Sequence, residues 1–128
     1  MTAPSWRPPS SSKPARRAPR PRNDAERHAA RWYRLHGYRI LDTNRWIAGY
    51  ELDVVARRGS TVVFCEVKSK SGTRFGDPLE MVTPEKVRRV RRAAEAWLAV
   101  HPECAALAVR FDVIVERAGR LEHIPNAF

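Results

Sequence analysis

The chain has 128 residues and a formal net charge of +10, a length that suits one domain and a charge that favours a polyanionic partner. A solvated basic surface with no dedicated partner is the alternative. The two cysteines show no metal-ligand spacing, which argues against a structural zinc site and for a reducing compartment. No apolar run approaches the ~18–20 residues of a membrane span, and the start lacks the apolar core of a secretory signal, so we expect a cytoplasmic protein without membrane contact.

Residues 1–22 contain six of the ten prolines, six basic residues and no acidic residue. A segment of this composition cannot bury enough apolar surface to offset its ordering entropy, so we predict a disordered basic tail. The tail could act as an arm that adds sequence-independent affinity for nucleic acid. A transit peptide, which the prolines disfavour, and a tail without function are the alternatives. The folded domain is then expected to cover residues 23–128.

The first helix is predicted to begin at Asn23, the N-cap of a capping box with Glu26, and to end at Gly37. Its core stripe comprises Ala29, Ala30, Tyr33 and either Trp32 or Leu35. A second helix should begin at Thr83 and Pro84, after a loop over 69–82, and end before Pro102. Its predicted buried residues are Val87, Val90, Ala94, Trp97 and Leu98.

Strands are predicted over 38–41, 50–57, 61–68, 107–115 and 120–124, and the connection 42–49 can continue as strand. The resulting order predicts an α/β fold in which a mixed β-sheet of about five strands is flanked by two main helices. Of the histidines, His36 is expected at the surface or in a cap, and His123 stays undecided.

The stretch from Tyr50 to Lys70 organises this plan, because it reads as a hairpin with charged residues toward one end. Alternation along a strand places Glu51 and Asp53 on one face, and Glu66 and Lys68 on one face. The inner positions are expected to be apolar on one face: Leu52, Val54, Val63, Cys65 and Val67.

The register of the hairpin decides which of these charges meet. A turn with Arg57 opposite Ser60 sets Glu51 against Glu66, with Asp53 on the diagonal. Carboxylates so close repel each other unless something positive sits among them, and a divalent cation is the simple answer. An ordinary edge-strand pattern, with Asp53 paired to an arginine, explains the same residues.

Phosphodiester hydrolysis needs a metal on hard oxygen ligands, an activated water and charge that offsets the oxyanion. Asp53 and Glu66 can supply carboxylate oxygens, and the Val67 carbonyl a neutral ligand. Lys68 can orient the water or stabilise negative charge, and Glu51 can bind through water or assist a second metal. The expected cofactor is Mg²⁺ or Mn²⁺.

The second helix begins with a cluster of basic residues that lies mostly off its apolar stripe. It is interpreted as a phosphate-contacting surface, with a solvated basic face as the alternative. The predicted nucleic-acid contacts are Lys70, Lys86, Arg88, Arg89 and Arg92.

Several segments, in this order, resemble the YraN-like family of uncharacterised predicted endonucleases, which is similar to archaeal Holliday junction resolvases and to restriction-endonuclease-like folds. The matching pieces are AERHAARWYRLHGYRIL (25–41), Asn44, ELDVVA (51–56), VVFCEVKSK (62–70), FGDPLEMVTPEKVRRVRRAAEAWL (75–98), RFDVIV (110–115) and HIPNAF (123–128). The tail is not covered.

The resemblance implies a PD-(D/E)xK-type site with Asp53 and Glu66 as metal ligands and Lys68 as the catalytic lysine. It also implies that Glu26 faces the site, and that Glu51 corresponds to the acid two residues before the aspartate. The implied function is a DNA endonuclease acting on branched or damaged DNA, and resolvase-like enzymes often work as homodimers. The chain departs from the family at Tyr50, where glycine is usual, so local backbone or substrate access is expected to differ.

Two other functions fit the same sequence. A non-catalytic nucleic-acid-binding module would retain the fold and the basic surface without turnover. An adaptor for other proteins would have no nucleic acid partner at all.

Overall fold

The computed structural model describes residues 24–70 and 82–128. Its elements are α1 (Asp24–Leu35), β1 (Arg39–Ile47), β2 (Tyr50–Arg58), β3 (Thr61–Lys70), α2 (Pro84–Ala99), a short 3₁₀ helix η2 (Pro102–Cys104), β4 (Ala108–Arg117) and β5 (Arg120–Ile124). The predicted tail, the Asn23 cap and most of the loop 69–82 lie outside the described residues.

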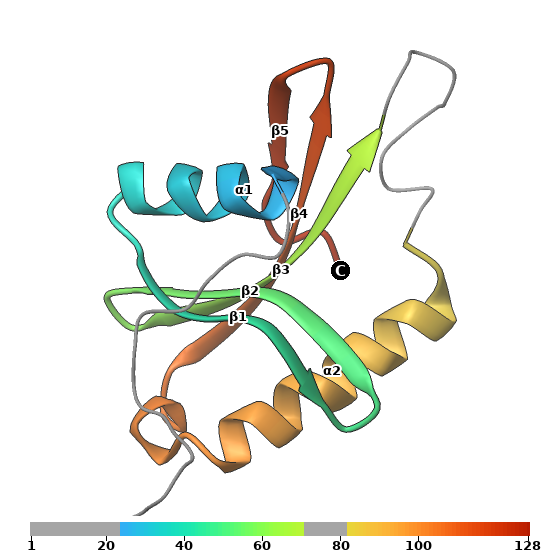
Figure 1. The fold of residues 1–128 in the computed structure, drawn as a ribbon. Helices are drawn as coiled ribbons and strands as arrows, with labels where there is room; N and C mark the ends of the chain where they lie inside the picture. The colour runs from blue at the N-terminus through green and yellow to red at the C-terminus, as the bar shows by residue number, and fades with distance from the viewer. Residues whose placement is uncertain (1–23, 71–81) are drawn as a thin grey trace, which may run out of the picture.

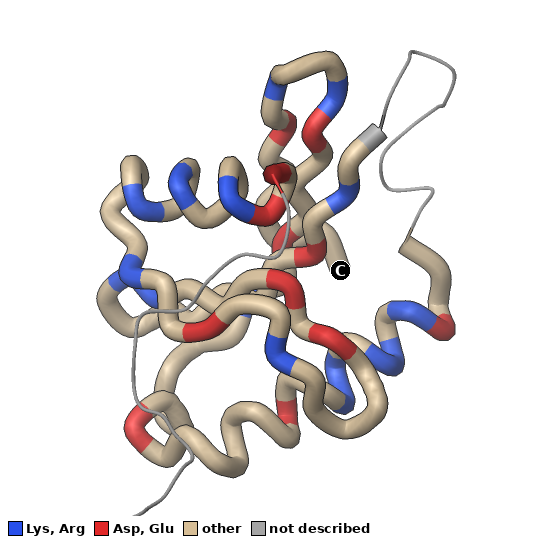
Figure 2. Tube along the Cα trace, viewed as in Figure 1, with Lys and Arg blue, Asp and Glu red and all other residues tan. Residues whose placement is uncertain are grey.

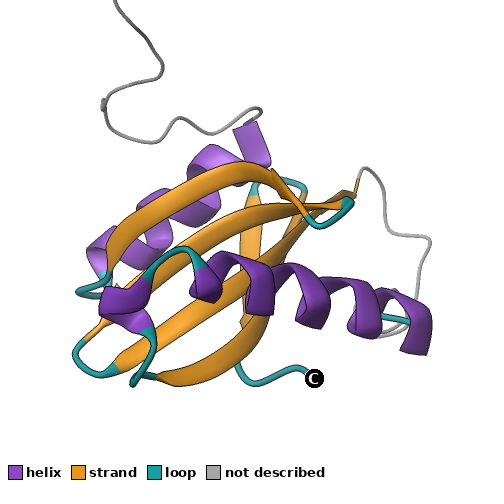
Figure 3. Ribbon diagram, turned by 90° about the horizontal axis from the view of Figure 1, so that it is seen from below, coloured by secondary structure: helices purple, strands orange, loops and turns teal. Residues whose placement is uncertain are grey.

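The five strands form one sheet in the order β1-β2-β3-β4-β5. All neighbours are antiparallel except β3 and β4, which are parallel and are joined through α2. The two helices lie on opposite faces of the sheet (Figures 1 and 3). The predicted α/β fold, a mixed five-stranded sheet flanked by two main helices, is therefore confirmed. Within the described residues, neither helix has the length and apolarity that crossing a membrane requires.

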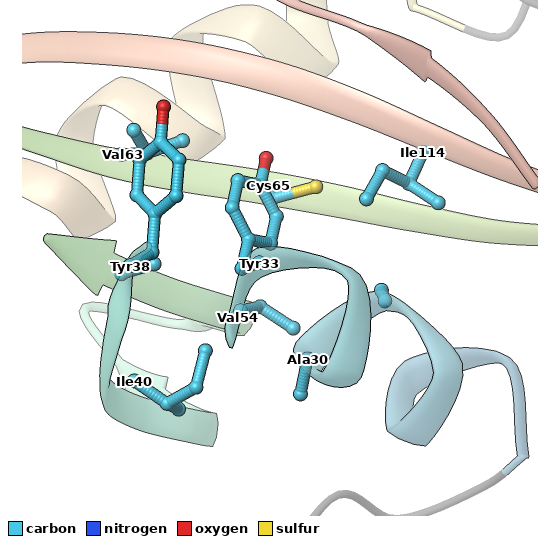
Figure 4. Packing of buried hydrophobic residues seen from close by; sticks show 10 residues of the cluster. Ala30, Tyr33, Tyr38, Ile40, Val54, Val63, Cys65 and Ile114 are labelled. Atoms are coloured by element: carbon cyan, nitrogen blue, oxygen red, sulfur yellow. The ribbon is translucent and has the colours of Figure 1, made fainter. Parts of the chain in front are cut away.

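Helix α1 covers one face of the sheet with the stripe that the sequence predicted. Ala29, Ala30 and Tyr33 are fully buried against strand residues such as Val54 and Cys65 (Figure 4). The choice between two stripe residues is also settled, because Trp32 packs on this core whereas Leu35 is 70% exposed.

Helix α2 covers the other face and starts at the predicted cap, where the Thr83 hydroxyl accepts a hydrogen bond from the Lys86 amide at 3.1 Å. Its Trp97 is fully buried and donates through Nε1 to Asp42 Oδ2 at 3.0 Å, which ties the helix to β1. The buried residues of this helix are Val90, Ala93, Ala94 and Trp97, while Val87 and Leu98 are half-buried.

Strand β1 is longer than its predicted core at 38–41 and continues to Ile47, as residues 42–49 allowed. The β1–β2 turn consists of Ala48 (φ 52°) and Gly49 (φ 77°), and two successive positive φ values are typical of a type I′ turn. Gly49 thus takes the left-handed position, and Tyr50 enters β2 without a positive φ. The positive φ that a tyrosine would adopt only at a cost therefore falls on Gly49, one residue before Tyr50.

Strand β2 does not keep one set of residues on one face. Val54 packs in the cluster under α1, whereas Leu52 and Val55 pack in the cluster under α2. Simple alternation would put Leu52 and Val54 together, so the prediction of one common inner face is wrong for Leu52. The strand reverses its faces at Asp53, where it lies opposite a left-handed residue of β1, Asn44 (φ 51°).

The predicted register of the β2–β3 hairpin is also wrong. Arg58 pairs with Thr61, so the two loop residues are Gly59 and Ser60 rather than Arg58 and Gly59. Gly59 has φ 60°, which suits the first central position of a type II′ turn. Continuing this register beyond the Val54–Cys65 pair sets Asp53, and not Glu51, against Glu66.

Candidate active site

The corrected register brings two acidic side chains together at the middle of the sheet. The Val67 amide donates to Asp53 Oδ2 at 2.9 Å, which anchors the aspartate on β3 beside Glu66. Burial, and next the charge of Glu66, raise the pKa of Asp53 to about 7. The charge of Glu66 therefore opposes the ionisation of Asp53.

Glu66 is 4% exposed and is held by groups from two other elements. The Tyr50 hydroxyl of β2 donates to Glu66 Oε1 at 2.8 Å, and Lys86 Nζ of α2 lies 3.9 Å from the same oxygen. Burial raises the pKa of Glu66, against the Tyr50 hydrogen bond and the charges of Lys68 and Lys86, which lower it.

Two lysines converge on this glutamate. Lys68 lowers the pKa of both carboxyl groups, as expected for the lysine of the motif. Lys86 comes from the first turn of α2, and its pKa is lowered by burial and by the neighbouring Lys68. Lys86 was predicted as a phosphate contact on the helix surface, but the structure places it at the carboxylates.

Glu26 joins the site from α1, as the family resemblance implied. It is 7% exposed, and its Oε1 accepts a hydrogen bond from Asn44 Nδ2 at 2.7 Å. Its charge raises the pKa of both Asp53 and Glu66, so three carboxylates act on one another. Its proposed capping role depends on Asn23, which lies outside the described residues.

Glu51 does not take the expected position opposite Glu66, which Asp53 occupies. It sits between Tyr50 and Leu52, which both pack toward α2, so by alternation Glu51 faces the opposite side of β2. Its charge is not among the largest influences on the pKa of Asp53 or Glu66. The expectation that Glu51 lies opposite Glu66 is thus wrong.

Three of the remaining predicted nucleic-acid contacts lie on the surface of α2. Arg88 and Arg92 are exposed, and Arg89 forms an ion pair with Glu85 at 2.6 Å. Backbone atoms place Lys70 at the end of β3, but its side chain lies outside the described part of the structure. Figure 2 shows basic residues along α1, in the first half of α2 and at the tip of the β4–β5 hairpin, with the acidic residues of β2 and β3 between them.

Two contributors to the site were missed by sequence reasoning: the Tyr50 hydroxyl and the Asn44 amide. From the sequence, Tyr50 stands out only because glycine is usual at its position. Nothing in its local sequence indicates which group its hydroxyl contacts. Asn44 stood out as an isolated matching residue, yet its contact with Glu26 joins residues 18 apart on different elements.

The donor set suits a hard divalent cation held in part by water. Within the described residues, Asp53 Oδ1 and Glu66 Oε2 take part in no hydrogen bond, which leaves one oxygen of each carboxylate for a ligand. No group of three or more Asp, Glu, His or Cys side chains in the described part of the chain is arranged to hold a metal ion. Two carboxylates and the Val67 carbonyl still match Mg²⁺, which keeps several waters and is often bound through one or two carboxylates.

Comparison with known proteins places these residues in a family. The model of the uncharacterised protein family UPF0102 matches residues 25–115, which include every site residue described above. A UPF0102 protein of Frankia casuarinae is 48% identical over 105 residues, which cover 78% of this chain and 88% of the relative. A UPF0102 protein of Geobacter metallireducens is 43% identical over 104 residues, covering 78% of this chain and 84% of the relative. A third, from Acidothermus cellulolyticus, is 40% identical over 117 residues, covering 80% and 89%.

Proposed function

Because this chain belongs to UPF0102, a family whose name states no activity, we propose its function from its own site: a metal-dependent nuclease that hydrolyses phosphodiester bonds in DNA. The observation that carries the proposal is the buried pair Asp53–Glu66. Each carboxylate is fixed through one oxygen, by the Val67 amide and by the Tyr50 hydroxyl, and two lysines stand beside the pair. Buried like charges destabilise a fold, and a ligand of opposite charge bound between them would offset that cost.

Asp53, Glu66 and the Val67 carbonyl would hold a Mg²⁺ or Mn²⁺ ion. When bound there, such an ion would stabilise charge on the phosphate and lower the pKa of a bound water. The ammonium groups of Lys68 and Lys86 can offset the negative charge that develops on the phosphate oxygens. Glu26, on the α1 side of the pair, can accept a proton or orient a water by hydrogen bonding.

Phosphate binding outside the site is assigned to α2. Arg88 and Arg92 are exposed on the helix whose first turn delivers Lys86, so a strand that reaches the carboxylates passes this surface. The formal net charge of +10 adds a sequence-independent attraction for DNA that salt will weaken. The family resemblance favours branched or damaged DNA as the structure recognised.

The test is a cleavage panel of linear duplex, single-stranded and branched DNA with Mg²⁺ or Mn²⁺. Asp53→Asn keeps the side-chain shape and an acceptor for the Val67 amide, so it should fold and yet lose more than about 100-fold in rate, since even indirect metal partners cost about 10–100-fold. The exposed acid Glu103, remote on η2, supplies the control Glu103→Gln, which should cleave normally. EDTA should abolish cleavage; a wild type that cuts no member of the panel would overturn the proposal.

The second candidate is a binding module without turnover, favoured by the exposed arginines of α2. It predicts salt-sensitive DNA binding that survives Asp53→Asn, weakens in Arg88→Gln/Arg92→Gln, and is accompanied by no cleavage. The same panel therefore separates the two candidates.

A further inference from the structure

Asn44 adopts a left-handed backbone conformation within a β-strand. It has φ 51° in the middle of β1, between the Thr43–Val54 and Arg45–Leu52 pairs, and it lies opposite Asp53. Asparagine tolerates the left-handed region better than most residues, but glycine adopts it without steric cost. If the positive φ were the sole requirement, glycine would suit this position better than asparagine.

The amide of Asn44 has a specific use that glycine could not provide. Its Nδ2 donates to Glu26 Oε1 at 2.7 Å and so fixes the α1 carboxylate, whose charge acts on Asp53 and Glu66. A hydrogen bond to an ionised carboxylate is among the stronger ones in proteins. Asn44, which lies opposite Asp53 on β1, thus links this part of the sheet to Glu26 of α1.

Unsatisfied polar atoms are concentrated at the same place. Among the described residues, two buried side-chain oxygens lack a hydrogen-bond partner, and they belong to neighbours: Thr43 Oγ1 and Asn44 Oδ1. Native structures leave few such atoms, and each calls for an explanation. Oxygens beside a catalytic carboxylate can be satisfied by a donor that arrives with the substrate or with a hydrated cation.

We propose that Asn44 is a positioning residue of the nuclease site: its Nδ2 holds Glu26 beside Asp53 and Glu66, and its Oδ1 accepts a hydrogen bond from a water of the loaded site. The inference rests on the proposed function and assigns a role to Asn44, whose side chain, within the described residues, donates to Glu26 and not to either of the two proposed metal-ligand carboxylates. This role accounts for an asparagine rather than a glycine at the left-handed position, for the contact with Glu26 and for the buried oxygen.

The discriminating variant is Asn44→Gly, which suits the left-handed backbone and removes only the amide. Asn126 (φ 54°) provides a matched control, Asn126→Gly, in the C-terminal segment, where its backbone amide donates to Asp112 rather than to a site residue and is kept in the glycine variant. Both variants should fold with thermal midpoints near that of the wild type. Asn44→Gly alone should lower the cleavage rate at saturating DNA by about 10–100-fold, with KM for DNA unchanged, and weaken Mn²⁺ binding by about 10-fold or more.

Coupling to Glu26 is tested by a double-mutant cycle. If Asn44 acts through the glutamate, Glu26→Gln should reduce the rate similarly, and Asn44→Gly/Glu26→Gln should be no worse than the more severe single variant. Independent, multiplying effects would overturn the positioning role.

The outcomes separate the inference from the proposed function. A wild-type enzyme that cleaves, together with an Asn44→Gly variant that cleaves and binds Mn²⁺ equally well, overturns the inference and leaves the nuclease intact. A wild type that binds Mn²⁺ without cleaving overturns the nuclease, and calorimetric titration of Asn44→Gly with Mn²⁺ then decides the inference. A wild type that neither cleaves nor binds Mn²⁺ overturns both.

Discussion

Two aspartates of this protein experience opposite electrostatic environments. At Asp53, burial and a neighbouring glutamate raise the pKa to about 7. At Asp112, which is fully buried, burial also acts to raise the pKa, but hydrogen bonds from Arg110, His123 and Tyr33 outweigh it and hold the pKa below the ordinary value. The ionised form of Asp112 is stabilised by its hydrogen-bond donors, whereas at Asp53 the charge of Lys68 and the Val67 hydrogen bond do not outweigh burial and the neighbouring glutamates.

Asp112 is therefore a structural acid, and its removal should destabilise the fold. Arg110 Nε donates to Oδ1 at 2.8 Å, Tyr33 donates to Oδ2 at 2.7 Å, and His123 Nε2 lies 2.8 Å from Oδ2. Asp112→Asn should lower the free energy of unfolding at pH 7 by about 3 kcal/mol, because it leaves a partly buried arginine without its charged partner. Urea unfolding at pH 7 measures this loss, and the exposed Asp24→Asn is a control expected to change stability little.

The same carboxylate predicts a pH dependence with a definite sign. Since its pKa is lower in the folded than in the unfolded chain, its contribution is complete above about pH 5 and is lost as the pH falls through the folded-state pKa. The stability difference between wild type and Asp112→Asn should therefore shrink below about pH 4. Urea titrations at pH 7 and pH 3 that gave the same difference would contradict the assignment.

At the scale of elements, the β2–β3 hairpin decides whether the acids meet. Gly59 has φ 60°, and an added Cβ at this position would meet no atom within 4 Å. Gly59→Ala should therefore cost only the backbone strain of the left-handed conformation, about 1–2 kcal/mol, while Gly59→Asn should cost less. Chemical unfolding of both variants measures the strain; an alanine variant as stable as wild type would contradict the type II′ assignment.

The elements themselves were largely predictable from local patterns. The apolar stripe around Ala29 and Tyr33, and the Thr83–Pro84 start of α2, reflect helix periodicity and capping, which depend on nearby residues. The hairpin register was not predictable, because a two-residue loop can place Gly59 at either central position. The fold adopts the register in which Arg58 pairs with Thr61, and β3 also pairs there with β4, which is distant in sequence.

The site was predictable as a set of motif residues but not as a set of contacts. Asp53, Glu66 and Lys68 were selected from their spacing and from family resemblance, and the structure brings them together. The contacts of Tyr50 and Lys86 with Glu66 depend on the reversal of β2 at Asp53 and on the position of α2. Both are set by tertiary packing, which a local pattern does not encode.

At the scale of the whole molecule, the charge distribution suits one mode of DNA binding. Figure 2 shows the acidic residues of β2 and β3 between two helices that carry basic residues, so in the proposed function phosphates would be attracted to the flanks and repelled from the centre. A cation at the centre would remove this repulsion where the scissile phosphate must approach. In the proposed function, the carboxylate pair therefore serves to bind a divalent cation.

Calorimetric titration with Mn²⁺ tests cation binding by the carboxylate pair and needs no knowledge of the DNA substrate. Wild-type protein should bind Mn²⁺ at pH 7.5, Asp53→Asn and Glu66→Gln should each bind it at least about 10-fold more weakly, and Glu103→Gln should match the wild type. Circular dichroism of each variant establishes that the fold is retained. A wild type that takes up no Mn²⁺ at millimolar concentrations would rule out a divalent-cation site at Asp53 and Glu66. Folded Asp53 and Glu66 variants that bind Mn²⁺ as well as the wild type would rule it out equally.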